Sequence, residues 1–417
     1  MKLILTVLSC LFVVAFSYAQ PIDSLRLSVS QAEEIFVKKN LLLAAEQYNI
    51  DAAKALEIQA KLYPNPEFSA DLHGYDTDTR KVFYNNRSGQ KGFAIEQLLL
   101  LGGKRKNEMA LAKHNTQLAV LEFEDLVRQL KYTLRTNLYT VHFHLKTVEK
   151  YNKQLVLLDT IISTYQRQAE KGNIPLVDVV RLKSTYMKLT NDKSEVLQNI
   201  LQAQQELQVL LLTDQFVVPD LDNINWQNYT SLPALDILQQ QTLTHRSDQK
   251  IGTLNKTIAG LEVKYQKSMA VPDLTAGAAY DQQGDAFRNQ YNIKLGIPLP
   301  LWNRNQGNIK MAKAKEKQSA VNSELVQQNL FAETRTAWYN MGRSINEYDK
   351  TTAIYNEDFT HVLKGVSDNF LKRNITLLEF VDFFESYNET TAELYRVQQQ
   401  LITAAETINY VTASPVF

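Results

Sequence analysis

Several residue types are scarce in this sequence of 417 residues, and each scarcity excludes a class of protein. Cysteine occurs only at Cys10, so the chain has no disulfide framework. Lys and Arg total 45 and Asp and Glu total 45, and this neutrality argues against nucleic-acid binding. Glycine and proline number only 14 and 10, which favours long helices. Beyond Gln20 no apolar run reaches the length of a membrane helix, so any membrane crossing there has to use strands.

The first 19 residues have the pattern of a secretory signal peptide. Lys2 supplies the positive charge, residues 3–16 are apolar, and Ser17-Tyr18-Ala19 is a small-x-small cleavage site. A membrane anchor is one alternative, but the apolar stretch is short for a span. A lipoprotein site at Cys10 is another, although the apolar run continues past that residue. We therefore expect an exported protein whose mature chain has no cysteine.

Two short segments recur at one spacing along the chain. Residues 171–180 (KGNIPLVDVV) match residues 372–381 (KRNITLLEFV), an offset of 201 (372 − 171). Residues 101–103 (LGG) and 302–304 (WNR) have the same offset (302 − 101), and each follows a strand-like run and precedes a long helical segment. Self-similarity at two places with one offset indicates two copies of one supersecondary unit.

Each copy is predicted to run helix, strand, loop, strand, very long helix, tight turn, helix. Residues 104–171 contain neither Gly nor Pro, and 68 helical residues (171 − 104 + 1) would extend roughly 100 Å. The second long helix is weakened by Gly342 and Gly365. The predicted organisation is a signal peptide over 1–19, a first repeat over 20–213, an equatorial linker over 214–246 and a second repeat over 247–417. The first repeat contains strands 67–74 and 92–99, long helix 104–171 and return helix 175–212. The second contains strands 273–281 and 290–298, long helix 308–372 and return helix 375–412.

A coiled-coil seam is predicted within the first long helix, because apolar residues there keep a 3-4-3-4 spacing. Two polar residues interrupt the seam. Its members are Leu138, Val141, Leu145, Val148, Asn152, Leu155, Asp159 and Ile162. Two tight turns should follow the long helices. Pro175 suits the first position of one return helix, and Thr376 with Glu379 forms the capping box of the other.

The four predicted strands alternate apolar and polar residues. Phe68, Ala70 and Leu72 share one face of the first strand, and Tyr291, Ile293 and Leu295 share one face of the last. Such alternation is typical of a membrane barrel, but a soluble sheet with one wet face shows it too. The signal peptide, the repeat and the long helices favour the membrane. Four strands cannot close a barrel, and an open edge is not tolerated in lipid, so copies of the chain must associate.

The residues that would support catalysis are not grouped in this sequence. His142 and His144 are the only close histidines, and residues two apart on a helix point in different directions. Gly102-Gly103-Lys104 lacks the spacing of a phosphate-binding loop. We therefore expect no enzyme activity, no cofactor and no metal site.

Four motifs resemble the TolC family of outer-membrane efflux proteins. They are residues 30–33 (SQAE), 63–66 (YPNP), 101–105 (LGGKR) and 297–307 (IPLPLWNRNQG). The last is similar to the heavy-metal branch of the family, which handles cobalt, zinc and cadmium or copper and silver. The resemblance covers nearly the whole mature chain. It implies a mainly α fold with membrane β: three copies form a 12-stranded β-barrel continued by an α-helical tunnel through the periplasm.

The resemblance also implies partners and site residues. The partners are a periplasmic adaptor and an inner-membrane pump of the resistance–nodulation–division type, with outer-membrane lipid around the barrel. Glu379 and Asp382 match acidic positions that narrow the pore and favour cations, although acidic residues in a first helical turn also simply complement the helix dipole. The turns that would dock the adaptor contain Gly172, Asn173, Pro175, Asp178, Arg373 and Asn374. Arg373 replaces a glycine common in the family, and Ile375 replaces a basic residue, so links between the hairpins are in question.

The sequence therefore predicts a passive trimeric duct in the outer membrane of a Gram-negative bacterium, extending into the periplasm and exporting small toxic solutes or metal cations. One alternative is the outer-membrane duct of a type I protein secretion system, which differs only in its partner. Another is a soluble periplasmic coiled-coil interaction protein whose strands never meet lipid.

Overall fold

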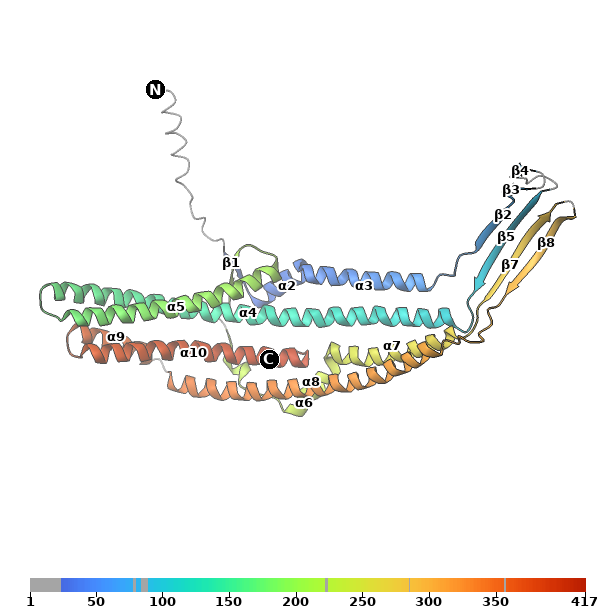
Figure 1. Ribbon diagram of the computed structural model, residues 1–417. Coiled ribbons are helices and arrows are strands. Elements are labelled where there is room, and N and C mark those ends of the chain that lie inside the picture. Colours follow the sequence, from blue (N-terminus) through green and yellow to red (C-terminus); the bar gives the residue numbers. More distant parts are fainter. Residues whose placement is uncertain (1–23, 78–79, 84–88, 222–223, 285, 356–357) are drawn as a thin grey trace, which may run out of the picture. The chain divides into compact units, whose positions relative to one another are not determined.

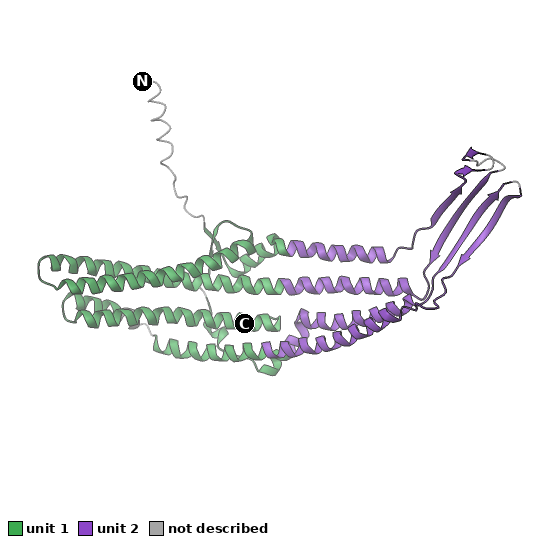
Figure 2. Ribbon diagram, viewed as in Figure 1, with its two compact units in different colours: residues 1–42, 127–239, 334–417 green, residues 43–126, 240–333 purple. Residues whose placement is uncertain are grey.

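The computed structural model describes residues 24–417 except 78–79, 84–88, 222–223, 285 and 356–357. The predicted signal peptide and Cys10 lie outside the described residues. The chain divides into two compact units (Figure 2): unit 1 comprises residues 1–42, 127–239 and 334–417, and unit 2 comprises residues 43–126 and 240–333.

Unit 2 contains the four-stranded sheet, whose strand order is β2-β5-β7-β8 (Figure 1). All three pairs are antiparallel, so β5 and β7 lie in the middle, while β2 and β8 each leave one edge unpaired among the residues that the structure describes. The strands are β2 (Glu67–Leu72), β5 (Gln90–Leu99), β7 (Leu274–Gln283) and β8 (Phe287–Gly296), and β3 (Tyr75–Asp76) and β4 (Lys81–Val82) form a small hairpin.

The helices of unit 2 precede or follow the strands of the sheet along the chain. They are α3 (Leu41–Ala60), the first part of α4 (Lys104–Glu170), α7 (Ser247–Met269) and the first part of α8 (Gln306–Ile354). Among the described residues, no helix combines the length and the apolar character that a membrane span needs.

Unit 1 consists mainly of helices, and a parallel pair of short strands links the start of the chain to its middle. The elements are β1 (Ser24–Leu27), α2 (Val29–Lys39), the rest of α4, α5 (Leu176–Leu211), β6 (Phe216–Pro219), the short helix η1 (Trp226–Tyr229), α6 (Leu235–His245, whose end passes into unit 2), the rest of α8, α9 (Asp358–Leu371) and α10 (Leu377–Thr412). Arg135 of α4 joins this unit's elements, because it binds Glu33 of α2 at 2.5 Å and Glu406 of α10 at 3.0 Å.

The predicted helix over 308–372 is wrong as a single element, since α8 ends at Ile354 and α9 begins at Asp358. Neither Gly342 nor Gly365 lies at this division. The end of α8 is instead rich in β-branched residues, which are poor helix formers. The Thr352 hydroxyl also donates to the Tyr348 carbonyl at 2.7 Å, a bond that bends helices.

The predicted seam of α4 is only partly correct. Leu138, Val141, Leu155 and Ile162 are buried, but Asn152 and Asp159 are exposed and so do not interrupt the core. The core side chains at that level are Tyr151 and Leu158, one residue earlier, which pack in one cluster with α5 and α10 residues. The buried face of α4 shifts because the neighbours of the helix change along its length. Tyr139 and Phe143 belong to a different cluster, with Ile402.

Candidate functional site

The first tip turn joins α4 to α5 and is closed by the backbone of Gly172. Gly172 has φ +72°, a left-handed conformation that glycine adopts without steric cost. Its N–H donates to the Ala169 carbonyl at 2.9 Å, and the Asn173 N–H donates to the Gln168 carbonyl at 2.9 Å. These two bonds form a Schellman motif, which satisfies the last carbonyls of α4.

The second tip turn joins α9 to α10 and repeats this geometry with a different residue. Arg373 occupies the left-handed position with φ +62°. Its N–H donates to the Phe370 carbonyl at 3.0 Å, and the Asn374 N–H donates to the Asn369 carbonyl at 2.9 Å. The backbone turn is therefore preserved although the glycine is missing, at the cost of placing a Cβ atom where it is disfavoured.

Glu379 combines the capping role and the charge that sequence predicts for it. The Thr376 N–H donates to Glu379 Oε2 at 2.7 Å, and the Glu379 N–H donates to the Thr376 hydroxyl at 3.2 Å. The bonds from Thr376 hold the pKa of Glu379 below its ordinary value, so this exposed carboxyl stays ionised. Asp382 is also exposed, one turn further along α10.

The charges of Glu379 and Asp382 are not neutralised by ion pairs within the described residues, whereas the next acidic residues along α10 bind Lys188 or Arg396. Two unpaired anionic side chains at the start of α10 can attract a cation. Their role in a pore stays a prediction, because it requires the other copies of the chain.

The first tip also presents an apolar surface that the sequence did not single out. Leu176, Val177 and Val180 are all exposed, and Val177 shows 66% of its surface. At the matching positions of the second tip, only Leu378 is similarly exposed, at 64%; Leu377 is partly buried. The sequence carries no signal for this difference, because the matching positions 377, 378 and 381 are apolar as well. Pro175 precedes α5 without a side-chain cap, and Asp178 lies in its first turn.

An aromatic stack lies directly behind the two turns. Tyr165 of α4 stacks on Phe370 of α9 with ring centroids 4.9 Å apart, and Phe370 stacks on Phe380 of α10 at 4.3 Å. Phe370 and Phe380 are fully buried. The stack packs the first hairpin against the second within one chain. It does so near the turn that contains Arg373 and Ile375, where the sequence departs from the family pattern and polar links between the hairpins are in question.

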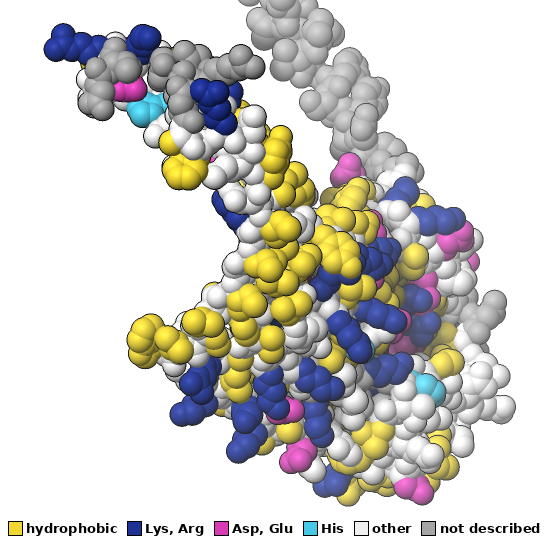
Figure 3. Space-filling view, turned by 90° about the vertical axis from the view of Figure 1, so that its right-hand side faces the viewer, with side chains coloured by type: hydrophobic (Ala, Val, Ile, Leu, Met, Phe, Trp, Pro, Cys, Tyr) yellow, Lys and Arg dark blue, Asp and Glu magenta, His cyan; other side chains and the backbone are white. Residues whose placement is uncertain are grey.

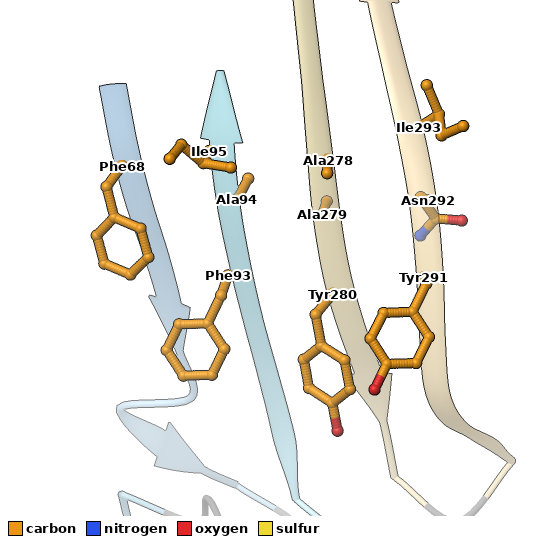
Figure 4. Close-up of a pocket in the computed structure, with 10 residues that line it drawn as sticks. All are labelled: Phe68, Phe93, Ala94, Ile95, Ala278, Ala279, Tyr280, Tyr291, Asn292 and Ile293. Atoms are coloured by element: carbon orange, nitrogen blue, oxygen red, sulfur yellow. The ribbon is translucent and has the colours of Figure 1, made fainter. Parts of the chain in front are cut away.

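The sheet of unit 2 has one continuous apolar face. Figure 4 shows the rings of Phe68, Phe93, Tyr280 and Tyr291 in a row across all four strands. Successive centroids are 6.3, 6.4 and 5.5 Å apart, yet Tyr291 exposes 81% of its surface. A row of neighbouring rings, three of them exposed, beside exposed Ile95 is unfavourable in water, and it suits a surface that a partner or lipid covers.

The opposite face of the sheet is polar. Glu96 of β5 and Lys294 of β8 form an ion pair of 3.2 Å although β7 lies between their strands. The residue between them in register is Gly277, which has no side chain to block the pair. A Cβ atom on Gly277 would lie 2.6 Å from the Ile95 carbonyl oxygen and 2.8 Å from Glu96 Cγ. Asn292 donates to Asp281 Oδ2 at 2.8 Å on the same face.

The acidic and histidine side chains of the described part of the chain are dispersed. No group of three or more His, Cys, Asp or Glu side chains there is placed to hold a metal ion. His142 is buried, and its ring meets Phe143 edge to face at 5.1 Å.

Comparison with known proteins agrees with this architecture. Residues 36–211 match the family described as outer membrane efflux protein. The chain is 24% identical over 289 residues to the cobalt-zinc-cadmium resistance protein CzcC of Cupriavidus metallidurans. That match covers 68% of this chain and 65% of the relative, slightly less than two thirds of the relative's length.

Two solved structures share the fold over almost the whole chain. A structure of CusC superposes with a TM-score of 0.75 at 17% identity, covering 96% of each chain. The open state of the Neisseria gonorrhoeae MtrE outer membrane channel gives a TM-score of 0.71 at 13% identity, covering 93% of this chain and 89% of the other. The predicted TolC-like fold is thereby confirmed.

Proposed function

Because residues 36–211 match the family described as outer membrane efflux protein, we propose that three copies of the chain form a passive duct through the outer membrane of a Gram-negative bacterium. The duct exports small toxic solutes or metal cations that an inner-membrane pump and a periplasmic adaptor deliver. It performs no chemical reaction, in keeping with a family of channel proteins.

The four-stranded sheet with two unpaired edges carries the proposal. Its aromatic and aliphatic face is exposed, while β2 and β8 each have one edge that pairs with no strand in the described part of the chain. In hydrocarbon such edges must be paired, and pairing β8 of one copy with β2 of the next closes a cylinder. Three copies then supply twelve strands, with the apolar face toward lipid and the Glu96–Lys294 face toward a wet lumen.

The two tips have different roles in this proposal. The first tip, with Gly172, Asn173, Pro175, Asp178 and the exposed apolar residues beside them, receives the adaptor. In the second, Arg373 and Asn374 form the turn that positions Glu379 and Asp382. Three copies bring six carboxylates to the pore entrance, where they attract cations.

A metal cargo is proposed on two grounds. One relative is called a cobalt-zinc-cadmium resistance protein. The unpaired acidic residues of the second tip would favour a cation over an anion or a neutral solute. The resistance–nodulation–division class, a proton-driven pump, is the proposed energy source.

Conductance measurements test the proposal. Purified protein inserted into planar bilayers should conduct and should prefer cations, and Glu379→Gln with Asp382→Asn should lower the cation preference severalfold without abolishing conductance. Glu393→Gln is the matched control on α10, because Arg396 already pairs with that residue. The pore role of Glu379 and Asp382 would be rejected if the double variant kept its cation preference, or if only the control lost it. Absence of conductance in the unmodified protein would reject the duct.

A further inference from the structure

Five exposed lysines gather where the helices of unit 2 meet the sheet. They are Lys106 of α4, Lys264 and Lys267 of α7, and Lys310 and Lys313 of α8. On the face shown in Figure 3, Lys and Arg side chains crowd next to the apolar side chains, and Asp and Glu are fewer. We call these five residues the basic collar.

Specific contacts hold the three helix ends of the collar together. The Asn107 side chain of α4 donates to the Lys264 carbonyl of α7 at 3.4 Å. The Asn305 side chain, just before α8, donates to the Gln266 carbonyl of α7 at 2.7 Å. The lysines therefore project from one fixed scaffold rather than from independent segments.

The collar's charges are available for an external partner. Within the described residues, none of the five lysines forms an ion pair. The nearby carboxylate of Asp273 already forms an ion pair with Lys104 at 2.7 Å. Glu262 accepts a hydrogen bond from the Gln266 side chain at 2.7 Å. Unpaired cations that lie close together repel one another, and binding to an anionic surface would relieve this repulsion.

An apolar loop adjoins the collar. Between β8 and α8, Ile297, Leu299, Leu301 and Trp302 are all exposed, and Trp302 shows 86% of its surface. Arg304 follows and donates from Nε to the Pro300 carbonyl at 3.2 Å, which shapes the turn. Exposed Trp and Leu beside Arg and Lys is the composition of a membrane–water interface.

The spacing matches the thickness of a headgroup layer. Lys310 lies four residues into α8 and Lys313 seven, which corresponds to roughly 6 and 10 Å along the helix. The headgroup region on each side of a bilayer is about 5–8 Å thick. Flexible lysine side chains can bridge the remaining distance to a phosphate.

We propose that the loop 297–302 inserts into the periplasmic leaflet of the outer membrane and that the basic collar binds the phosphates of anionic glycerophospholipids there. This inference rests on the proposed function, because it requires the sheet to lie in lipid. Each lysine near an anionic surface strengthens binding about fivefold, so several together select anionic over zwitterionic lipid.

Lipid retention by the trimer tests this proposal. Purified protein is equilibrated in mixed micelles with phosphatidylglycerol and phosphatidylcholine, and the lipids bound per trimer are counted by native mass spectrometry. The unmodified trimer should retain phosphatidylglycerol preferentially. Replacing Lys106, Lys267, Lys310 and Lys313 with Gln should reduce that preference at least tenfold, and raising the salt concentration should reduce it in the unmodified protein.

The matched control changes Lys113, Lys256, Lys315 and Lys317 to Gln, which removes four exposed lysines from the same helices further from the sheet. The control should keep the preference. An equal loss in both variants, or no loss in the collar variant, overturns the proposal. Failure of the unmodified protein to form trimers or to conduct would instead reject the proposed function, whereas a conducting trimer without lipid preference rejects the collar alone.

The emission of Trp302 gives an independent readout. Phosphatidylglycerol brominated on its acyl chains should quench part of the tryptophan fluorescence, and Trp302→Phe should remove most of that quenching. Quenching that persists unchanged in Trp302→Phe would show that the loop does not enter the leaflet.

Discussion

At the residue scale, the two tip turns show how one backbone geometry is reached with different side chains. Gly172 and Arg373 occupy equivalent left-handed positions, and the hydrogen bonds around them match. For Arg373 this conformation costs about 1–2 kcal/mol that a glycine would not incur. The second tip is therefore held under local strain that the first tip lacks, and the aromatic stack behind it provides the packing that opposes this strain.

Exchanging residues at these two positions should change the stability of each tip in opposite directions. Arg373→Gly relieves the strained φ and should stabilise the second turn by about 1 kcal/mol, while Gly172→Ala should destabilise the first turn by about the same amount. No heavy atom lies within 4 Å of a Cβ at Gly172, so the second effect would be conformational rather than steric. Hydrogen exchange of the tip amides measures both. Slower exchange around Gly172→Ala would contradict the prediction.

The capping box should set the pH at which cation preference is lost. Thr376 lowers the pKa of Glu379, so the carboxylate keeps its charge, and the pore its preference, as the pH falls through the ordinary range of a glutamate. The Thr376 hydroxyl donates to Glu379 Oε2 at 2.8 Å, and Thr376→Ala removes this bond, which should raise the pKa of Glu379 and shift the loss of preference to higher pH. Thr390→Ala, on the same helix, should leave the profile unchanged. Coincident profiles for all three proteins would refute the link.

At the element scale, the sheet depends on small residues where side chains reach across a strand. Gly277 lies between Glu96 and Lys294 in register and lets them pair over β7. The sequence shows alternation but not register, so neither this pair nor the aromatic row across all four strands could be read from it.

Gly277→Ala should therefore damage the sheet. Its Cβ would lie 2.6 Å from a backbone oxygen of β5, and the strand must shift to admit it, at a cost on the order of 1–3 kcal/mol. Gly296→Ala is the control, because its Cβ would meet nothing closer than Thr275 Cβ at 3.8 Å. The temperature at which the assembled protein dissociates should fall for the first variant only. Equal dissociation temperatures would show that β7 adapts freely.

The tips provide the second test at this scale. Val177→Glu places a charge on the exposed apolar surface of the first tip and should weaken adaptor capture at least tenfold, since a desolvated charge opposes an apolar contact. Leu378→Glu, at the matching and equally exposed position of the second tip, should weaken it less. Crosslinking yield with the adaptor measures both. A stronger effect at Leu378 would reverse the assignment of the docking tip.

The elements were more predictable than their packing. The absence of Gly and Pro from 104 to 171 predicted α4 almost to its end at Glu170, and the capping box of α10 is present as expected. The buried face of α4 was misplaced near Asn152 and Asp159, since the helix changes neighbours along its length and a constant repeat cannot express this change. The glycines do not predict the division between α8 and α9, because α8 ends among β-branched residues instead.

At the scale of the whole molecule, the open sheet is the feature that requires association, because lipid does not tolerate unpaired strand edges. Within its described residues, unit 2 leaves the outer edges of β2 and β8 unpaired and exposes an apolar face. Unit 1 packs around its own clusters, including the one built on Leu401 and Ile408, and its helices have no sheet edge to pair. Association is therefore expected to be driven by the strands, and the helices follow.

The mass of the purified particle tests this claim most directly. Mature protein extracted from outer membranes in mild detergent should contain three chains per particle by light scattering, and it should precipitate or aggregate when detergent is removed. A single chain per particle that remains dispersed without detergent would contradict the account.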